Sequence, residues 1–122
     1  MTLSEFYAAV GGNYADAAAR LRKDRLIASF LRRLPQEPSS ALLGDALRAG
    51  DAKTAFRAAH TLKGIALNLS LDALAAACGG LTEALRGQDT LPPEAKALYH
   101  GVQAEYERVL EALALLETPP AD

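Results

Sequence analysis

Apolar residues recur every three or four positions along most of the chain, a spacing typical of the buried face of an α-helix. The segment after Ser70 shows it clearly. Its apolar positions are Leu71, Leu74, Cys78, Leu81 and Leu85. The same spacing returns near the C-terminus, at Leu98, Val102, Tyr106, Val109, Leu110, Leu113 and Leu116. The pattern therefore predicts helices along the chain.

Glycines, prolines and capping residues divide this pattern into six predicted helices. The first, second and fourth cover about residues 4–10, 14–34 and 52–69. The third lies between the prolines of 35–38 and Gly50, the fifth follows Ser70, and the sixth starts at Pro92-Pro93. The expected N-caps are Ser39 or Ser40, Asp51 and Ser70. The charged run at residues 22–25 interrupts the second helix and predicts a kink or break there.

Alanine and leucine dominate the apolar composition, with 26 Ala and 21 Leu against 3 Val and 2 Ile. Ala and Leu are good helix formers, whereas strands favour β-branched and aromatic side chains. The composition therefore argues against a β-sheet. Short connections favour antiparallel packing of consecutive helices. The predicted fold is all-α: a single domain over residues 1–122, built as an antiparallel four-helix bundle with additional short N-terminal helices.

Charge and composition exclude several functions. The 122 residues carry 13 basic and 15 acidic side chains, a formal net charge of −2, which argues against binding to nucleic acid or a membrane surface. No apolar run approaches the ~20 residues of a membrane span, and the N-terminus does not resemble a secretory signal. The single cysteine, Cys78, cannot form an internal disulfide, which favours the cytoplasm. We expect a monomer.

The predicted helix over residues 52–69 has two different faces on a helical wheel. One is the expected core stripe of Ala52, Ala55, Ala59, Leu62, Ala66 and Leu69. His60 points away from this stripe. Its angular neighbours are Lys53, Arg57, Lys63 and Gly64, with Phe56 and Leu67 beside them. His60 is therefore expected on an exposed face with three cations and no acid.

This combination favours nucleophilic chemistry at phosphorus. Neutral imidazole is a nucleophile near neutral pH, and nearby cations favour the neutral form. Lys63, one turn after His60, can pair with phosphoryl oxygens. Glycine inside a helix costs about 1 kcal/mol relative to alanine. Gly64 nevertheless lies one turn after His60, where a missing side chain leaves room for a partner to approach the ring.

Each of these features also has an ordinary explanation, because most exposed histidines and lysines on helices are solvated side chains. The other candidate sites have less support. His100 lacks the Lys-Gly spacing, and Cys78 lies among the apolar positions of its helix as a small core residue. No acid or second histidine lies three or four residues from His60, so a metal site is not expected. The sequence contains no phosphate-binding loop.

The residues around His60 resemble a known motif. The run Ala59-His60-Thr61-Leu62-Lys63-Gly64, preceded by Ala55-Phe56-Arg57-Ala58, is similar to the phosphorylation motif of histidine-containing phosphotransfer (HPt) domains of two-component phosphorelays. Residues 11–14, 47–51 and 69–71 extend the resemblance, which covers roughly residues 10–90. The last predicted helix fits the family in length.

The resemblance implies that His60 is the phosphoacceptor, modified on Nε2, that Lys63 neutralises phosphoryl charge and that Gly64 gives access. Receiver domains of response regulators or hybrid histidine kinases would dock over this face and exchange phosphoryl groups between their aspartate and His60. The receiver would supply Mg²⁺, so this chain would need no cofactor and would act as a carrier, not an enzyme. The expected partner-binding residues are Lys53, Phe56, Arg57, Leu67, Thr82 and Arg86.

Two positions depart from the family pattern. Thr82 stands where many members have a Gln that orients the active histidine, and its side chain has a shorter reach. Ser70 replaces a common Gly at the turn between two helices but can still cap. Arg86, one turn after Thr82, is expected either to contact the partner or phosphoryl group or to be a solvated arginine. Gly79-Gly80 indicates close packing, a cleared docking surface or a local irregularity.

Two other functions fit the same features. One is a helical adaptor that docks receiver domains without being phosphorylated. The other is a substrate module of a chemotaxis-type kinase, phosphorylated directly by an ATP-binding domain. Phosphorylation of His60 separates the carrier from the adaptor, and a genomic neighbour with an ATP-binding domain would favour the kinase module.

Overall fold

Helices are the regular elements of the computed structural model, which describes residues 1–120 and has no strand among them. In chain order they are α1 (Leu3–Ala9), α2 (Tyr14–Leu21), α3 (Asp24–Arg33), the short 3₁₀ helix η1 (Leu34–Gln36), α4 (Ser39–Arg48), α5 (Ala52–Asn68), α6 (Asp72–Leu85) and α7 (Ala95–Ala114). The predicted all-α class is confirmed.

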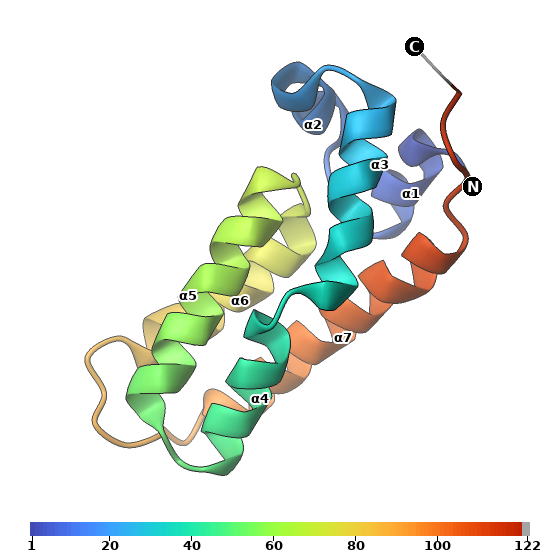
Figure 1. The fold of residues 1–122 in the computed structure, drawn as a ribbon. Coiled ribbons are helices and arrows are strands. Elements are labelled where there is room, and N and C mark those ends of the chain that lie inside the picture. The colour runs from blue at the N-terminus through green and yellow to red at the C-terminus, as the bar shows by residue number, and fades with distance from the viewer. Residues whose placement is uncertain (121–122) are drawn as a thin grey trace.

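Helices α4 to α7 form the bundle, and each runs antiparallel to the next (Figure 1). α5 packs against both α4 and α6, and α6 packs against α7. α4 closes the bundle against α7 at Gly44, where a Cβ atom would lie only 2.7 Å from the Tyr99 hydroxyl oxygen. A glycine at this position therefore leaves room for the Tyr99 side chain of α7 against α4.

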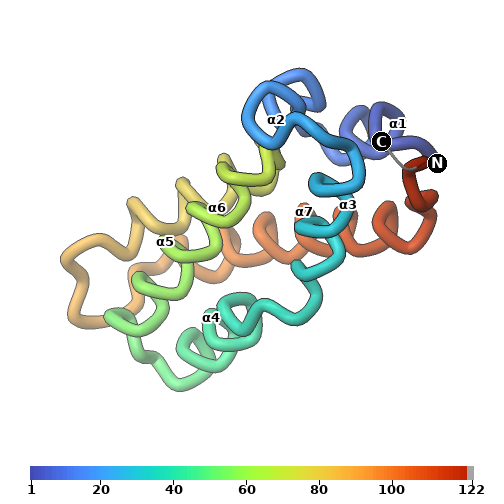
Figure 2. The backbone as a smooth tube through the Cα atoms, turned by 45° about the horizontal axis from the view of Figure 1, so that its top comes forward, coloured from blue at the N-terminus to red at the C-terminus, as the bar shows by residue number. Residues whose placement is uncertain are grey.

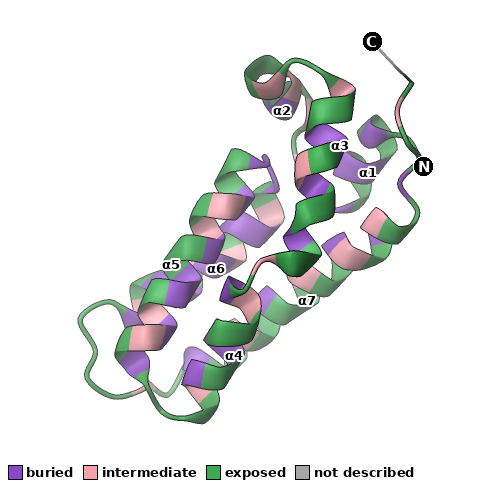
Figure 3. Cartoon of the chain, viewed as in Figure 1, coloured by how far each residue is buried: buried purple, intermediate pink, exposed green. Residues whose placement is uncertain are grey.

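The core lies where the bundle helices face one another and continues into α1, α2 and α3 (Figure 3). On α5 the six positions of the predicted core stripe are all buried, from Ala52 to Leu69, and Ala58 is buried with them. Five of these seven side chains are alanine methyl groups, so neighbouring helices pack closely over this face. On α6 Cys78 is also fully buried, as predicted for a small core residue, and burial raises its pKa to about 12.

The predicted second helix is broken at the charged run, as its pattern indicated. α2 ends at Leu21 and α3 begins at Asp24. Between them Arg22 adopts a left-handed conformation with φ of 68°, which turns the chain. The break lets α2 lie across the end of the bundle while α3 crosses α7 (Figure 2).

Hydrogen bonds fasten the N-terminal segment to the α5–α6 turn. The buried Tyr7 hydroxyl donates to the Leu69 carbonyl at 2.7 Å. The Asn13 backbone N–H donates to the Ser70 carbonyl at 2.9 Å, and the Ala73 N–H donates to the Gly11 carbonyl at 3.1 Å. The residues before α3 therefore hold the end of α5 in place.

One predicted N-cap is confirmed and another is wrong. The Asp51 carboxylate caps α5 by accepting from the Thr54 N–H at 3.0 Å and hydroxyl at 2.6 Å, and the hydroxyl hydrogen bond lowers the pKa of Asp51. Ser39 is the first residue of α4 and not its cap. Pro38 occupies the cap position, and the Glu37 carboxylate accepts from the Ser39 N–H at 3.1 Å.

Ser70 does not cap α6, contrary to the prediction from sequence. It is fully buried in the turn, with a left-handed φ of 56°, and the cap position belongs to Leu71, without a side-chain cap. Its hydroxyl instead donates to Asp16 at 2.7 Å and accepts from Arg20 at 2.5 Å. A serine at this strained position therefore ties the turn to α2.

We expect Ser70→Ala to destabilise the fold by about 1–2 kcal/mol, because both hydrogen bonds are lost and the left-handed backbone remains strained. Ser70→Gly loses the same hydrogen bonds but removes the strain, worth about 1 kcal/mol, so it is expected to be the more stable variant. Urea unfolding followed by circular dichroism measures both. Equal stability of the two variants would show that the left-handed conformation carries no cost here.

Candidate functional site

His60 lies exposed near the middle of α5. Its orientation follows from the buried alanine stripe on the opposite side of the helix, which fixes how α5 is rotated in the bundle. Gly64, one turn later, is also exposed, and a Cβ atom there would meet nothing within 4 Å. The surface next to the His60 ring is therefore open to an approaching molecule.

Lys63 lies between α5 and α6 and is half-buried. Its aliphatic chain passes over Gly79, where a Cβ atom would lie 3.7 Å from Lys63 Cε. Such a spacing is ordinary van der Waals contact, and α6 continues unbroken through Gly79-Gly80. The glycine pair is therefore neither an irregularity nor a site of unusually close packing. Because Gly79 has no side chain, the aliphatic chain of Lys63 packs directly against α6.

Aromatic stacking holds the His60 ring. The Phe56 ring lies one turn earlier, with its centroid 6.0 Å from that of His60 and only 7° between the two planes. The Arg86 guanidinium, just after α6, lies 5.1 Å from the centre of the Phe56 ring. Arg86 therefore borders the His60 face.

The helical wheel of α5 predicted no acidic side chain near His60, but α6 contributes one, Glu83. The Glu83 carboxylate accepts two hydrogen bonds from Arg86, each at 3.0 Å. These hydrogen bonds and the charge of Arg86 lower the pKa of Glu83, and the charge of the neighbouring Lys63 lowers it further. Glu83 therefore lies within electrostatic reach of Lys63 and His60, and the expectation of an acid-free face is wrong.

Thr82 does not belong to the exposed face, and its expected place among the partner-binding residues is wrong. It is fully buried, and its hydroxyl donates to the Cys78 carbonyl one turn earlier at 2.7 Å. This bond within the helix uses the hydroxyl proton. Thr82 therefore does not orient the His60 ring; Phe56 is the residue in contact with it.

The remaining expected contact residues lie exposed along α5. Lys53 lies two turns before His60, and its ammonium is 3.7 Å from the Asp89 carboxylate, in the loop before α7. Arg57 donates to the Thr54 hydroxyl at 3.2 Å. Leu67 is an exposed large apolar residue at 50% accessibility. The face around His60 thus combines cations with apolar surface.

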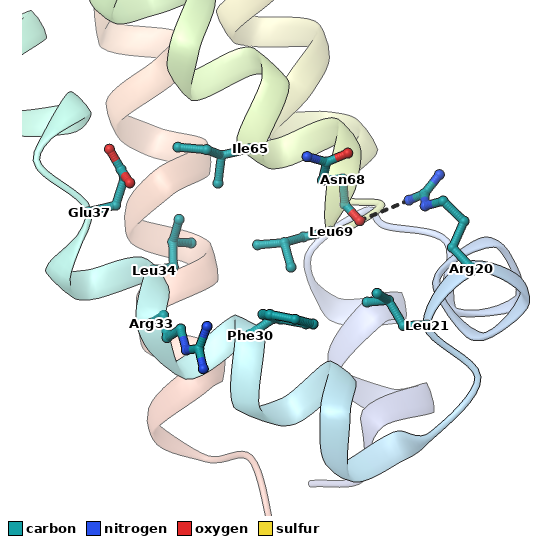
Figure 4. A pocket seen from close by; sticks show the side chains of 9 residues that line it. All are labelled: Arg20, Leu21, Phe30, Arg33, Leu34, Glu37, Ile65, Asn68 and Leu69. Atoms are coloured by element: carbon teal, nitrogen blue, oxygen red, sulfur yellow. Dashed lines mark hydrogen bonds between the residues drawn. The ribbon is translucent and has the colours of Figure 1, made fainter.

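A hollow of about 480 Å³ lies away from His60, between α3, η1 and the end of α5 (Figure 4). Its walls are mainly apolar, including Phe30 and Ile65. Three of its polar side chains already have structural contacts. Arg20 donates to the Asn68 carbonyl at 3.0 Å, Arg33 lies over Phe30, and Glu37 binds Ser39. His60 is not among its lining residues, so the hollow is separate from the surface around His60.

Two further features are absent from the described part of the chain. No cluster of three or more His, Cys, Asp or Glu side chains able to hold a metal ion occurs in it. Nor does any described helix combine the length and the apolar character that crossing a membrane requires.

The sequence alone missed Glu83 and the order of contacts from His60 to Phe56 to Arg86. The stack could have been predicted, because residues four apart on a helix are neighbours. The positions of Glu83 and Arg86 near this stack could not have been predicted, because they depend on how α6 is rotated and shifted against α5.

Comparison with known proteins identifies the family. The family model described as the Hpt domain matches residues 25–114, well over half of the chain. Residues 11–14, part of the resemblance seen in the sequence, lie outside this match. No curated protein and no solved structure matches the chain. The chain belongs to the Hpt domain family, whose members carry phosphoryl groups on histidine in phosphorelays.

Proposed function

We propose that His60 is the phosphorylated histidine and that the chain, as one domain, carries phosphoryl groups between receiver domains. The observation that carries this proposal is the open surface at His60. The ring is exposed, Gly64 leaves the space beside it empty, and Lys63 lies on the same side of α5.

The chemistry is a transfer between an acyl phosphate and an imidazole. The lone pair of His60 Nε2 attacks the phosphorus of a receiver phospho-aspartate, the P–O bond breaks, and the aspartate leaves as a carboxylate. The reverse displacement passes the group to an aspartate of a second receiver. Positioning and charge neutralisation supply most of what such a transfer needs, and Lys63 is placed to pair with the phosphoryl oxygens.

A docked receiver would cover the side chains around His60. Lys53, Phe56, Arg57, Leu67 and Arg86 offer cations beside apolar surface, which suits an acidic pocket with an apolar rim. The receiver would hold Mg²⁺ in that pocket.

His60→Gln is expected to abolish labelling by a phosphorylated receiver, because the glutamine amide is not a nucleophile. Helical circular dichroism and thermal melting should stay nearly unchanged, since the side chain is exposed. The label on the wild-type chain should be acid-labile and stable to base, as a P–N bond requires. Undiminished labelling of the variant would contradict the assignment.

Gly64 should affect stability and function in opposite directions. Gly64→Ala is expected to stabilise the protein by roughly 0.5–1 kcal/mol through helix propensity and the unfolded chain, since the new methyl group meets no neighbour. Gly64→Leu is expected to slow phosphotransfer at least tenfold by crowding the ring.

Gly101, exposed in α7 and equally free of neighbours, is the matched control. Gly101→Leu should leave the transfer rate unchanged. A wild-type rate for Gly64→Leu would mean that access to His60 does not depend on this glycine.

Lys63 and Lys53 should act on different steps. Lys63→Ala is expected to slow transfer within the complex even at high salt, because this ammonium pairs with the phosphoryl group. Lys53→Ala should mainly lower the association rate and its salt dependence, because a cation two turns away acts on encounter. Asp89→Asn, which frees Lys53, should raise the association rate.

Quench-flow measurement with a phosphorylated receiver at two ionic strengths resolves the two steps. Identical behaviour of Lys53→Ala and Lys63→Ala would show that the basic residues act as one undifferentiated patch.

A further inference from the structure

Arg86 connects an acid on α6 to the ring pair on α5. Its Nε and Nη2 donate to the two carboxylate oxygens of Glu83, and its guanidinium lies over Phe56, which stacks on His60. About half of the Arg86 side chain is exposed, at 54%. The guanidinium is therefore held beside the site by contacts that an exposed side chain can exchange.

A phosphoryl group on His60 would change the balance of charge around Arg86. Such a group brings up to two negative charges and three strong acceptor oxygens. Guanidinium binds phosphate and carboxylate with the same planar fork of N–H donors. The phosphoryl group would attract Arg86 and repel Glu83, so the two anions would compete for one cation.

We infer that Arg86 changes partner with the phosphorylation state of His60, pairing with Glu83 when the ring is free and with the phosphoryl oxygens when it is modified. Glu83 and Arg86 would thereby set the lifetime of phospho-His60. This inference rests on the proposed function of His60 and goes beyond it, because it concerns the lifetime of the phosphorylated state and not the transfer step.

The opposing effects follow from the hydrolysis that ends this lifetime. A water oxygen attacks phosphorus, the P–N bond breaks, the imidazole takes up a proton, and inorganic phosphate leaves. A cation on the phosphoryl oxygens disfavours protonation of the leaving imidazole, whereas a nearby carboxylate favours it. Arg86 should therefore protect the P–N bond, and Glu83 should shorten its lifetime, partly by competing for Arg86.

The experiment measures the decay of the phospho-His60 signal by phosphorus NMR after labelling with phosphoramidate. This small phosphoryl donor avoids any dependence on a receiver partner. A His100→Gln background removes the second histidine, which is also exposed. The variants are Arg86→Gln, Glu83→Gln, both together, and Arg86→Lys.

Exposed ion pairs have small effects, so we expect changes of about two- to fivefold. Arg86→Gln should shorten the half-life and Glu83→Gln should lengthen it. The effect of Glu83→Gln should be smaller in the Arg86→Gln background, because no guanidinium remains to be released. Arg86→Lys should recover part of the lifetime, since it keeps the charge without the planar fork.

Asp45→Asn is the matched control, because Asp45 and Arg48 form an exposed pair with the same spacing on α4. The inference is overturned if the two single variants change the half-life in the same direction, or if either changes it no more than Asp45→Asn does. Absence of a histidine label on the parent protein would instead contradict the proposed function of His60.

Discussion

The packing of one face of α5 determines the rest of the site. That face is built mainly of alanine, so α4 and α6 approach closely and the rotation of α5 about its axis is fixed. Because a helix places residues about 100° apart, burying Ala59 and Leu62 forces His60 outward. The same close contact brings α6 near enough for Gly79 to support Lys63 and for Arg86 to reach Phe56.

The charges at the site come from two helices and partly offset one another. α5 contributes the cations Lys53, Arg57 and Lys63, whereas Glu83 comes from α6. Several of these side chains already have partners, such as Asp89 for Lys53 and Glu83 for Arg86. The basic character of the face would therefore be adjustable under the proposed function, because an incoming phosphoryl group or acidic pocket would compete for cations that are paired but exposed.

Local pattern predicted most of the fold. Helix spacing, the break near Arg22 and the Asp51 cap all depend on neighbours in sequence, and the structure has each of them. Two of the errors, at Ser70 and Thr82, arose where distant segments meet. Ser70 was wrongly predicted to be a cap. Its actual contacts with Asp16 and Arg20 run between α2 and the α5–α6 turn, and local sequence does not show them. Thr82 was wrongly predicted to contact a partner. It is buried because tertiary packing sets the rotation of α6, which the sequence alone does not show. For the same reason the sequence identified His60, Lys63 and Gly64 as candidates but not Glu83.

The central claim is that the exposed imidazole of His60 takes up the phosphoryl group. The most direct test is a nitrogen-15 NMR spectrum of the two histidine rings after incubation with a phosphorylated receiver domain. His100, exposed on α7, serves as the internal reference. The account predicts a changed Nε2 resonance and a new phosphorus coupling at His60, with His100 unaltered. Phosphorylation at His100, or an unchanged His60 ring in a chain that has taken up the label, would contradict it.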